Sequence, residues 1–401
     1  MKILQICSKP PFPKKDGYAL AVNHITEALI AQGHRLKVIA ISTPKHGAED
    51  VPKSYKATTN FEYLFIDTTV RVVPAFLNLF SKNSYNTNRF YDNAFAIRLK
   101  QILRDQDFDI VLFEGLFVCP YFKVISENSN AKTVLRAHNI EADIWKGIVN
   151  QENNLIKKIY LKLLQKKLRN YEKSIVSKMD AIIGISDRDT YWLKQHRLET
   201  IWKNRQVATI PFAIDKVIKQ VHPEEKNTIF HIGSMDWKAN LDGIKWFLAD
   251  VFPLVTRQKK EITLHLAGRN TPSLFNHLIN GNIIIDGEVE SATAFMGKYN
   301  LMIVPLLNGS GIRIKILEGM AMGKTIISTT IGASGIKCQD QYNILIADTA
   351  EQFASQIIWC LENPLERNQI GENAKKNIQE YYNTDKISRQ LDSFLNKIIR
   401  S

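Results

Sequence analysis

The sequence predicts an α/β protein made of two doubly wound, Rossmann-like domains. Short apolar runs alternate with longer segments of helical periodicity along the whole chain. Many of these runs are rich in β-branched residues and almost continuously apolar, which is typical of parallel strands covered by helices on both faces. The chain has 401 residues, of which 45% are apolar and 23% charged, so it is long enough for two or three globular domains.

The predicted strands fall into two series, and helical patterns lie between them. The first series is 3–7, 36–42, 109–115, 133–138, 181–186 and 208–214. The second series is 228–233, 262–268, 283–286, 301–306, 325–328 and 344–348. The clearest helical patterns are 19–32, 241–258, 352–363 and 368–382.

The two series place the first domain at residues 1–220 and the second at 221–382. The polar stretch at 224–227 is typical of a linker. Residues 383–401 form a final predicted helix, for which packing back on the first domain is one option. Residues 45–88 have no regular pattern, and we read them as a mobile surface excursion.

Composition and motifs exclude several classes of protein. The four cysteines are far apart, without a CxxC pair, as in a reduced cytosolic protein without a zinc site. No apolar run is long enough to span a bilayer, and the first residues, MKILQIC, read as a strand rather than a signal peptide. The sequence also lacks GxGxxG and GxxxxGK[ST] motifs, which disfavours a dinucleotide site and a P-loop. We therefore expect a cytoplasmic protein.

The formal net charge of +13 is concentrated in the first half of the chain. Residues 1–215 contain 32 lysines and arginines against 21 acidic residues. Many of these cations lie in the predicted helix 155–178, where Leu161, Leu164 and Leu168 recur at helical spacing. We expect this stripe to pack on the protein's own core, while the lysines attract the anionic inner face of a membrane. Nucleic acid is disfavoured because few aromatic residues are interleaved with the cations.

The segment 301–329 is the most informative part of the sequence. An apolar run leads into the NGSG turn at 308–311, and a helical stretch with Arg313, Lys315 and Glu318 follows before a second apolar run. Glycines let backbone N–H groups approach a ligand, and a helix N-terminus favours an anion. Glu318 lies beyond that anion as a hydrogen-bond acceptor. The pattern predicts a site for a nucleotide diphosphate and its ribose, the alternative being an ordinary βα unit with solvated cations.

In open α/β sheets, ligands bind at the carboxyl ends of the strands. His138 ends the run 133–138, and Glu114 lies at the far end of the run 109–115. A histidine at that position can donate a hydrogen bond to a ligand and changes its charge near neutral pH, although a structural role is the alternative. Gly17 precedes the helix after the first strand, where it would let a phosphate approach.

Three Asp-x-Asp patterns occur, at 105–107, 107–109 and 187–189. The first two lie in the turn that enters a strand, which is the wrong end of the sheet for a ligand. The third opens a helix, where the dipole favours aspartate. We read all three as turn and cap residues, so no metal site is predicted.

The order and spacing of five motifs resemble the retaining glycosyltransferases of family 4. That family has the GT-B fold, in which two doubly wound Rossmann-like domains face each other across a cleft. The resemblance covers nearly the whole chain. The motifs are PPFPKKDG at 10–17, LRAHNIEA at 135–142, GSMDWKANLDGIKWFL at 233–248, HLAGRN at 265–270 and PLLNGSGIRIKILEGMAMGKTIIST at 305–329.

The resemblance implies an activity and its partners. A nucleoside-diphosphate sugar would bind mainly to the second domain, and a glycan or lipid-linked glycan acceptor to the first. Closure of the two domains would bring the substrates together. A hexose-type sugar would be transferred with retention of configuration and without a metal or other cofactor, during the synthesis of a surface polysaccharide or glycoconjugate.

The resemblance also assigns roles to individual residues. Gly17 would face the diphosphate, His138 would contact the donor sugar near the reacting carbon, and Glu318 would hold the ribose hydroxyls. Glu114 is a second catalytic candidate because of its position at a strand end. The other donor-binding residues are Ser234, Lys238, Asn240, Arg269, Gly309, Ser310, Gly311, Arg313 and Lys315.

Three positions depart from the family's pattern. Ser310 stands where the first of two acidic residues is common. Ser234 and Ala239 replace the usual Arg and Lys after the first strand of the second domain. These departures leave open which sugar hydroxyls are recognised, and hence which sugar is used.

Positive charge for the diphosphate must then come from other side chains. We infer that Arg313 and Lys315 supply it, with Lys238 as the alternative. A diphosphate leaving group needs cations and N–H donors where negative charge accumulates. We favour attack from the front face of the sugar over double displacement through Glu114.

Two other functions remain open from the sequence. A sugar-nucleotide epimerase of the same fold would convert the donor without an acceptor. A non-catalytic binder of sugar nucleotides or polyanions would bind a nucleoside diphosphate without hydrolysis or transfer.

Overall fold

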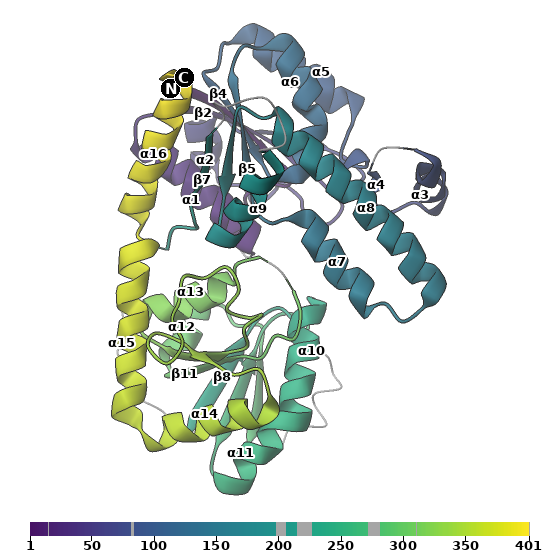
Figure 1. Ribbon diagram of the computed structural model, residues 1–401. Helices are drawn as coiled ribbons and strands as arrows, with labels where there is room; N and C mark the ends of the chain where they lie inside the picture. The colour runs from purple at the N-terminus through teal and green to yellow at the C-terminus, as the bar shows by residue number, and fades with distance from the viewer. Residues whose placement is uncertain are drawn as a thin grey trace. The chain divides into compact units, whose positions relative to one another are not determined.

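The computed structural model of the protein describes residues 1–14, 16–81, 84–197, 206–214, 227–271, 281–309 and 311–400. The chain forms two compact units, unit 1 from Met1–Ala213 with Thr384–Ser401, and unit 2 from Ile214–Asn383. Each unit is built on one parallel sheet with helices packed against it (Figure 1). The prediction of two doubly wound α/β domains is therefore confirmed.

Unit 1 contains a seven-stranded sheet with the strand order β3-β2-β1-β4-β5-β6-β7. Its strands are β1 (Lys2–Cys7), β2 (Arg35–Ser42), β3 (Glu62–Phe65), β4 (Ile110–Glu114), β5 (Lys132–Ala137), β6 (Ala181–Gly184) and β7 (Gln206–Thr209). Its longer helices are α1 (Gly17–Ala31), α5 (Asn93–Asp105), α7 (Glu141–Gln151), α8 (Leu155–Lys178), α9 (Asp187–Arg197) and α16 (Thr384–Arg400). Its shorter helical segments are α2 (Lys53–Thr59), α3 (Val72–Leu77), η1 (Asn78–Phe80), α4 (Tyr85–Asn88), η2 (Leu116–Tyr121) and α6 (Phe122–Asn128).

Unit 2 contains a six-stranded sheet with the strand order β10-β9-β8-β11-β12-β13. Its strands are β8 (Thr228–Ile232), β9 (Thr263–Ala267), β10 (Ile283–Gly287), β11 (Leu301–Val304), β12 (Thr325–Ser328) and β13 (Leu345–Ile346). Its helical segments are α10 (Lys238–Trp246), the π-helical η3 (Phe247–Val251), α11 (Phe252–Gln258), α12 (Ala292–Gly297), α13 (Ile314–Ala321), α14 (Ala350–Glu362) and α15 (Pro364–Tyr381).

Alternation along the strands of unit 1 produces two apolar cores, one on each face of the sheet. Ile3 and Leu112 belong to the core that α1 and α16 cover. Their neighbours Leu4 and Phe113 belong to the core that α5, α8 and α9 complete. Successive side chains of a strand point to opposite faces, so a sheet that is covered on both sides reads as a continuous apolar run.

The final helix α16 packs on unit 1 and lies alongside α1 (Figure 1). Ile387, Leu391, Leu395 and Ile398 repeat at helical spacing and are 0–2% exposed. Ser388 Oγ donates a hydrogen bond of 3.2 Å to the carbonyl of Ala28 in α1. The last helix of the chain therefore completes the core of the unit that contains its first strand.

Helix α8 buries the apolar stripe expected from the sequence. Leu161, Leu164 and Leu168 are 8%, 4% and 0% exposed. The prediction that this stripe packs on the protein's own core is confirmed. The described part of the chain contains no helix that is both long and apolar enough to cross a bilayer.

The description of residues 45–88 as an irregular surface excursion is wrong. This segment contains α2, β3 and α4, and it buries Ala48, Val51 and Phe61 in the core under α1. Strand β3 was missed because it has four residues, which are alternately half-buried and exposed at the edge of the sheet.

Some predicted boundaries differ from those of the structure. The predicted helix 241–258 is divided into α10, η3 and α11, because Pro253 has no N–H group and its ring crowds the preceding turn. The strand predicted at 208–214 is β7 (Gln206–Thr209). The predicted boundary at residue 220 and most of the predicted linker lie within 215–226, outside the described residues.

We expect Leu395→Ala to lower the free energy of unfolding by about 2–5 kcal/mol, because it leaves a cavity between α16 and α1. Urea unfolding followed by circular dichroism measures this change. Leu365→Ala in α15 is the control, because Leu365 is 80% exposed and its truncation should change stability by no more than about 0.5 kcal/mol. Equal stability of the two variants would contradict the packing described for α16.

Candidate functional site

The carboxyl ends of three adjacent strands in unit 1 bring together a buried polar network. The strand register pairs Glu114 in β4 with Cys7 in β1 and with Arg136 in β5. His138 follows β5 directly. Because parallel strands end at one edge of the sheet, these side chains meet there.

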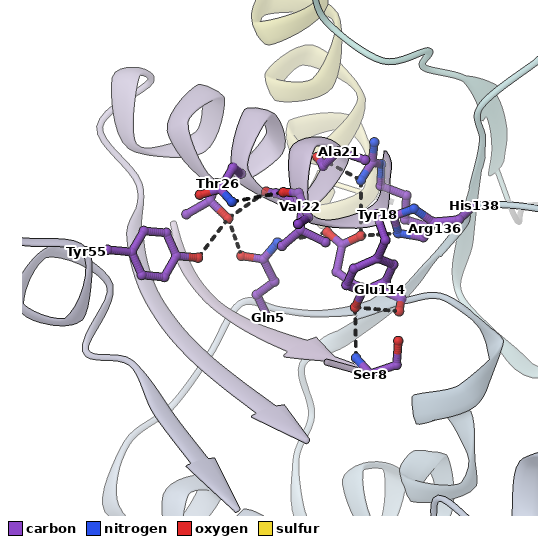
Figure 2. Close-up of polar contacts among 12 residues, drawn as sticks. Gln5, Ser8, Tyr18, Ala21, Val22, Thr26, Tyr55, Glu114, Arg136 and His138 are labelled. Atoms are coloured by element: carbon purple, nitrogen blue, oxygen red, sulfur yellow. Dashed lines mark hydrogen bonds and ion pairs between the residues drawn. The ribbon is translucent and has the colours of Figure 1, made fainter. Parts of the chain in front are cut away.

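Glu114 is the centre of this network (Figure 2). Gln5 Nε2 donates a hydrogen bond of 2.8 Å to Glu114 Oε1, and Arg136 Nη1 donates one of 3.1 Å to Oε2. His138 Nε2 lies 2.7 Å from the same Oε2 atom. Glu114 and Arg136 are both 0% exposed, so the carboxylate faces its partners and not a ligand.

The network fixes the charge states of Glu114 and His138. Burial alone would raise the pKa of Glu114, but Arg136, His138 and Gln5 together lower it, so the carboxylate is ionised. Burial lowers the pKa of His138 despite the carboxylate beside it, so the imidazole is neutral at pH 7. A neutral imidazole beside an ionised carboxylate carries its proton on Nε2, which leaves Nδ1 as a hydrogen-bond acceptor.

The start of α1 packs on His138. Tyr18 stacks on the imidazole with ring centroids 4.9 Å apart, and its hydroxyl accepts a 2.8 Å hydrogen bond from the backbone N–H of Ser8. Gly17, the residue before Tyr18, is the exposed first residue of α1. Asp16 caps this helix and forms a 2.6 Å ion pair with Lys9. Gly17 and His138 are thus brought together at one edge of the sheet.

A cavity of about 500 Å³ opens above this edge within unit 1. His138, Tyr18 and Lys9 form one side of it, and Glu141 lies at the start of α7. The other side is formed by Arg89, Phe90 and the segments 43–46, 68–70 and 115–117. The cavity is large enough for a sugar-sized ligand.

Arg89 is a half-buried cation in this cavity. Its Nη1 donates a 3.2 Å hydrogen bond to the carbonyl of Thr68, and its guanidinium lies 5.3 Å from the ring centroid of Phe90. Burial lowers its pKa. Within the part of the chain that the structure describes, it forms no ion pair with a carboxylate, and its buried Nε has no hydrogen-bond partner. Such a group favours an anionic ligand.

Glu141 contributes a carboxyl group to the cavity. Burial raises its pKa to about 7. The backbone N–H groups of Glu141 and Ala142 donate hydrogen bonds of 2.8 and 3.1 Å to the two carboxyl oxygens of Glu172 in α8. Glu172 therefore caps α7 and holds the segment from His138 to Glu141 in place. Burial also raises the pKa of Glu172, to about 8.

In unit 2, the predicted donor residues lie at the carboxyl ends of β8, β9 and β11, which are neighbours in the sheet. Two glycines allow the loops after β8 and β9 to approach closely. A Cβ atom on Gly268 would lie 1.8 Å from the carbonyl oxygen of Gly233, and Gly268 has a φ of +152°. The loops are thus fitted to each other through their backbones.

The loop after β11 holds Arg313 at the start of α13. Gly309 and Gly311 have φ values of +121° and +82°. Arg313 Nη1 donates a 2.7 Å hydrogen bond to the carbonyl of Gly311, and its guanidinium lies 4.8 Å from the ring centroid of Trp237. A Cβ atom on Gly309 would lie 2.7 Å from Arg313 Nη2, so the glycine leaves room for the arginine. Ser310 lies outside the described residues.

Arg313 occupies the N-cap position of α13 and not its first turn. Burial lowers its pKa to about 10, so it remains a cation at pH 7. Lys315, which is in the first turn, forms a 2.6 Å ion pair with Glu318. Two unpaired cations in the first turn would destabilise a helix through its dipole. In α13 this destabilisation is reduced, because Lys315 is paired and Arg313 lies at the N-cap.

Two further predicted donor residues lie in α10 and have partners in that helix or in the loop before it. Lys238 forms a 2.5 Å ion pair with Asp242, one turn along α10, and its side chain is 73% exposed. Asn240 is buried, and its Nδ2 donates a 2.8 Å hydrogen bond to the carbonyl of Ser234, which gives it a structural role in this loop.

Asp236 lies between Ser234 and Arg269. Ser234 Oγ is hydrogen-bonded to Asp236 Oδ1, and Asn270 Nδ2 donates a 3.3 Å hydrogen bond to Oδ2. The pKa of Asp236 is lowered by Ser234 first and by the positive charge of Arg269. The donor residues Ser234 and Arg269 therefore belong to one local cluster.

The expectation that Glu114 faces a ligand is wrong. The alternation of β4 places Glu114 on the same face as Ile110 and Leu112, and α1 covers that face. Its carboxylate holds His138 instead. Double displacement through Glu114 has no support from this geometry.

Sequence reasoning missed Arg89 and Glu141 as residues of the cavity. Glu141 was present in the motif LRAHNIEA, and its spacing of three residues from His138 could have indicated it. Arg89 lies in a region without periodicity, so no local signal pointed to it.

In the described part of the chain, no cluster of His, Cys, Asp and Glu could hold a metal ion.

Two family models match the chain over most of its length. A model described as Glycosyltransferase Family 4 matches residues 16–216, and one described as Glycosyl transferases group 1 matches residues 226–363. A curated relative is described as an uncharacterized 44.6 kDa protein in the cps region of Klebsiella pneumoniae. It is 27% identical over 396 residues, which are 96% of this chain and 97% of the relative.

Solved structures with low sequence identity share the fold. Sucrose-phosphate synthase from Thermosynechococcus elongatus has a TM-score of 0.72 at 15% identity, with 100% of both chains covered. HepE from Anabaena, solved in complex with UDP-glucose, has a TM-score of 0.66 at 12% identity, with 99% of each chain covered. These structures confirm the predicted GT-B fold class.

Stability should depend on pH through Glu172. Its pKa rises from about 4.3 in an unfolded chain to about 8 in the folded protein. The protonated state therefore stabilises the fold, and this contribution is lost as the pH rises from about 4.3 through about 8. We expect Glu172→Gln to reduce the loss of unfolding free energy between these values by at least about 1.4 kcal/mol, the equivalent of one pKa unit.

Urea unfolding of wild type and variant at a series of pH values measures this difference. Glu127→Gln in α6 is the control, because the Glu127 side chain is 57% exposed. The pH profile of the control should follow that of the wild type. A Glu172→Gln profile parallel to the wild type would show that Glu172 does not take up a proton on folding.

Proposed function

The chain belongs to glycosyltransferase family 4, and on this premise we propose that it transfers a hexose-type sugar from a nucleoside-diphosphate sugar to a glycan or lipid-linked glycan, with retention of configuration. Glycosyltransferase activity comes with the family. A donor of this class is supported by HepE, which was solved with UDP-glucose. The relative in the cps region supports a role in the assembly of a surface polysaccharide or glycoconjugate.

The arrangement of Arg313 is the observation that carries the proposal. The side chain is held over Trp237 by two glycines of left-handed conformation, at the N-terminus of a helix and at the carboxyl end of a strand. Backbone N–H groups, a helix dipole and a guanidinium then act at one place on one anion. Half-burial of the cation strengthens its attraction for a diphosphate, since the surrounding dielectric is lower than that of water.

The Lys315–Glu318 pair belongs to the same donor site in our proposal. Lys315 Nζ now lies 2.6 Å from Glu318 Oε2. We propose that the ribose hydroxyls donate hydrogen bonds to Glu318 and that Lys315 then turns toward the diphosphate. Lys238 is the less favoured cation because its side chain is 73% exposed and solvent screens its charge, whereas the side chain of Lys315 is 37% exposed.

We place the acceptor in the cavity of unit 1. Asn139 and Glu141 provide polar groups for its hydroxyls, and Phe90 and Tyr18 provide aromatic surface for a sugar ring. Arg89 favours an acceptor with a phosphate or carboxylate group, because the cation has no carboxylate partner in the described part of the chain. This composition suits a glycan that is linked to a lipid through phosphate.

The proposed reaction needs few covalent roles from the protein. The C1–O bond to the diphosphate breaks while the acceptor oxygen attacks from the same face, and the departing phosphate oxygen accepts the proton of the acceptor. Arg313 and the loop N–H groups stabilise the charge of the leaving group. His138, fixed by Glu114, orients the donor sugar near the reacting carbon. No metal or other cofactor takes part in this mechanism, and we propose a cytoplasmic enzyme at the inner face of the membrane.

Release of nucleoside diphosphate is the experiment that tests this function. The protein is incubated with UDP-, GDP- and ADP-sugars, with and without neutral and phosphate-bearing acceptors, and NMR gives the anomeric configuration of the product. Transfer with retention supports the proposal. A changed sugar nucleotide without any acceptor would identify an epimerase, and binding without turnover would identify a non-catalytic binder.

Removal of Arg313 should weaken transfer strongly. We expect Arg313→Ala to lower kcat/KM by about 10²–10³-fold, comparable with the loss of one oxyanion donor. Steady-state kinetics measures this effect, and thermal melts show whether the variant is folded. Lys238→Ala is the matched control. If Lys238→Ala is the severe variant and Arg313→Ala is near wild type, the diphosphate lies on Lys238 and our assignment is wrong.

Removal of His138 should affect turnover more than acceptor binding. We expect His138→Ala to lower kcat by at least about 10²-fold, because the imidazole positions the reacting sugar in the transition state. The control is His196→Gln, since His196 stacks on Trp192 and does not line the cavity. Unchanged kcat in a folded His138→Ala variant would remove this residue from the reaction.

A further inference from the structure

Helix α8 carries a second apolar stripe, opposite to the one that is buried. The residues of this stripe are 46–83% exposed: Leu155, Ile156, Ile159 and Leu163. Their spacings of three, four and seven residues place them on one face of the first two and a half turns. The buried residues Leu161, Leu164 and Leu168 lie on the other face. An exposed stripe of four large aliphatic side chains is unusual for a protein surface, where apolar residues are normally scattered.

Helix α3 extends this exposed surface. Val73 and Leu77, one turn apart, are 68% and 61% exposed. The helix is attached to α8 because Ala75 and Leu164 pack in one cluster, and Lys167 Nζ donates hydrogen bonds of 2.5 and 2.7 Å to the carbonyls of Asn78 and Ser81. We call the exposed apolar residues of these two helices the α3–α8 surface: Val73, Leu77, Leu155, Ile156, Ile159 and Leu163.

Lysines accompany the apolar side chains of α8. Lys158, Lys162 and Lys166 form no ion pair with any carboxylate in the described ranges of the chain. Lys162 and Lys166 are exposed and Lys158 is half-buried. Lys157 differs from them because Glu152 neutralises it at 2.6 Å. The long aliphatic stems of lysines can lie along an apolar surface while the ammonium groups reach outward.

We propose that the α3–α8 surface binds the surface of an anionic lipid bilayer. The aliphatic side chains would enter the boundary between headgroups and acyl chains, and the three lysines would contact lipid phosphates. A second copy of the chain is a poor occupant, because each copy has a net charge of +13 and would bring the same lysines to the contact. This surface differs from the stripe identified in the sequence, which is buried in the core.

The α3–α8 surface lies on the same unit as the cavity with Arg89. Residues 68–70 line the cavity and directly precede α3, and Glu141 lines it from the start of α7, which packs along α8. A lipid-linked molecule with its chain in the bilayer would therefore present its phosphate near the cavity. Binding of the protein to a bilayer is measured without turnover, so its outcome is independent of the proposed enzymatic function.

Sedimentation with large unilamellar vesicles tests the proposal. The full-length protein is mixed with vesicles of phosphatidylcholine alone, or of phosphatidylcholine with phosphatidylglycerol, at low and at physiological ionic strength. We expect binding to the phosphatidylglycerol vesicles that weakens with salt, since exposed charges are screened. A wild-type protein that stays in the supernatant with both kinds of vesicle overturns the proposal.

Variants separate the apolar and the electrostatic contributions. We expect Ile156→Ser with Ile159→Ser to lower the partition coefficient roughly tenfold or more, because two aliphatic side chains no longer enter the bilayer. Lys158→Gln, Lys162→Gln and Lys166→Gln together should lower it by about fivefold for each lysine. All of these residues are at least partly exposed, so the variants should melt like the wild type.

Matched controls change the same chemistry elsewhere on the chain. Leu365→Ser in α15 replaces a side chain that is 80% exposed, and the triple variant Lys100→Gln, Lys376→Gln and Lys397→Gln removes three exposed lysines. Both controls should bind vesicles like the wild type. If they lose as much binding as the α8 variants, the attraction is diffuse and the α3–α8 surface is not the site.

Light scattering of the protein without vesicles distinguishes self-association from lipid binding. The wild type and the Ile156→Ser, Ile159→Ser variant should have the same molar mass. If the wild type is an oligomer that this variant dissociates, the surface binds a second copy and the lipid proposal is wrong.

Discussion

The buried contact of Glu114 with Arg136 and His138 is the constraint on which the first unit's site depends. The strand register places Glu114 in β4 opposite Arg136 in β5, and His138 directly follows the end of β5. Because both members of the ion pair are fully buried, removing either one would leave an uncompensated charge in the core, which typically costs about 3–5 kcal/mol. The same contact keeps one imidazole nitrogen protonated and leaves the other available. The packing of the sheet and the protonation state of His138 therefore depend on the same buried contact.

In the second unit, the backbone conformation of three loops positions the candidate donor site. Its three loops come together because Gly233, Gly268 and Gly309 have no side chains at the points of closest approach. Arg313 fills the space beside Gly309 and rests on Trp237, so its direction is set before any anion arrives. A preorganised cation loses less conformational entropy on binding than a free one. In the first unit, a buried ion pair holds the candidate site in place. In the second unit, glycines at the loop contacts do so.

The sheets could be predicted from the sequence because their strands are buried on both faces and read as continuous apolar runs. The role of Glu114 could not, because a position at a strand end does not tell which face the next helix covers. Strand β3 and Arg89 lie in a segment that is held in place by contacts with α1, α5 and the sheet. Such contacts join residues far apart in the sequence, so the local sequence pattern does not predict this structure. The donor loop was recognisable because glycines, a cation and a helix start leave a local signature. Packing between residues that are far apart in the sequence leaves no such local signature.

Helix α16 gives the chain a nested organisation. The unit that begins at the first residue is completed by the 17 residues of Thr384–Arg400, after the whole second unit has been inserted between them. A ribosome therefore releases the second unit's residues before the first unit can close its core over Ile3 and Leu29. That apolar face therefore stays exposed to solvent until Thr384–Arg400 has been synthesised, and loss of these residues would open the core of the unit that was made first.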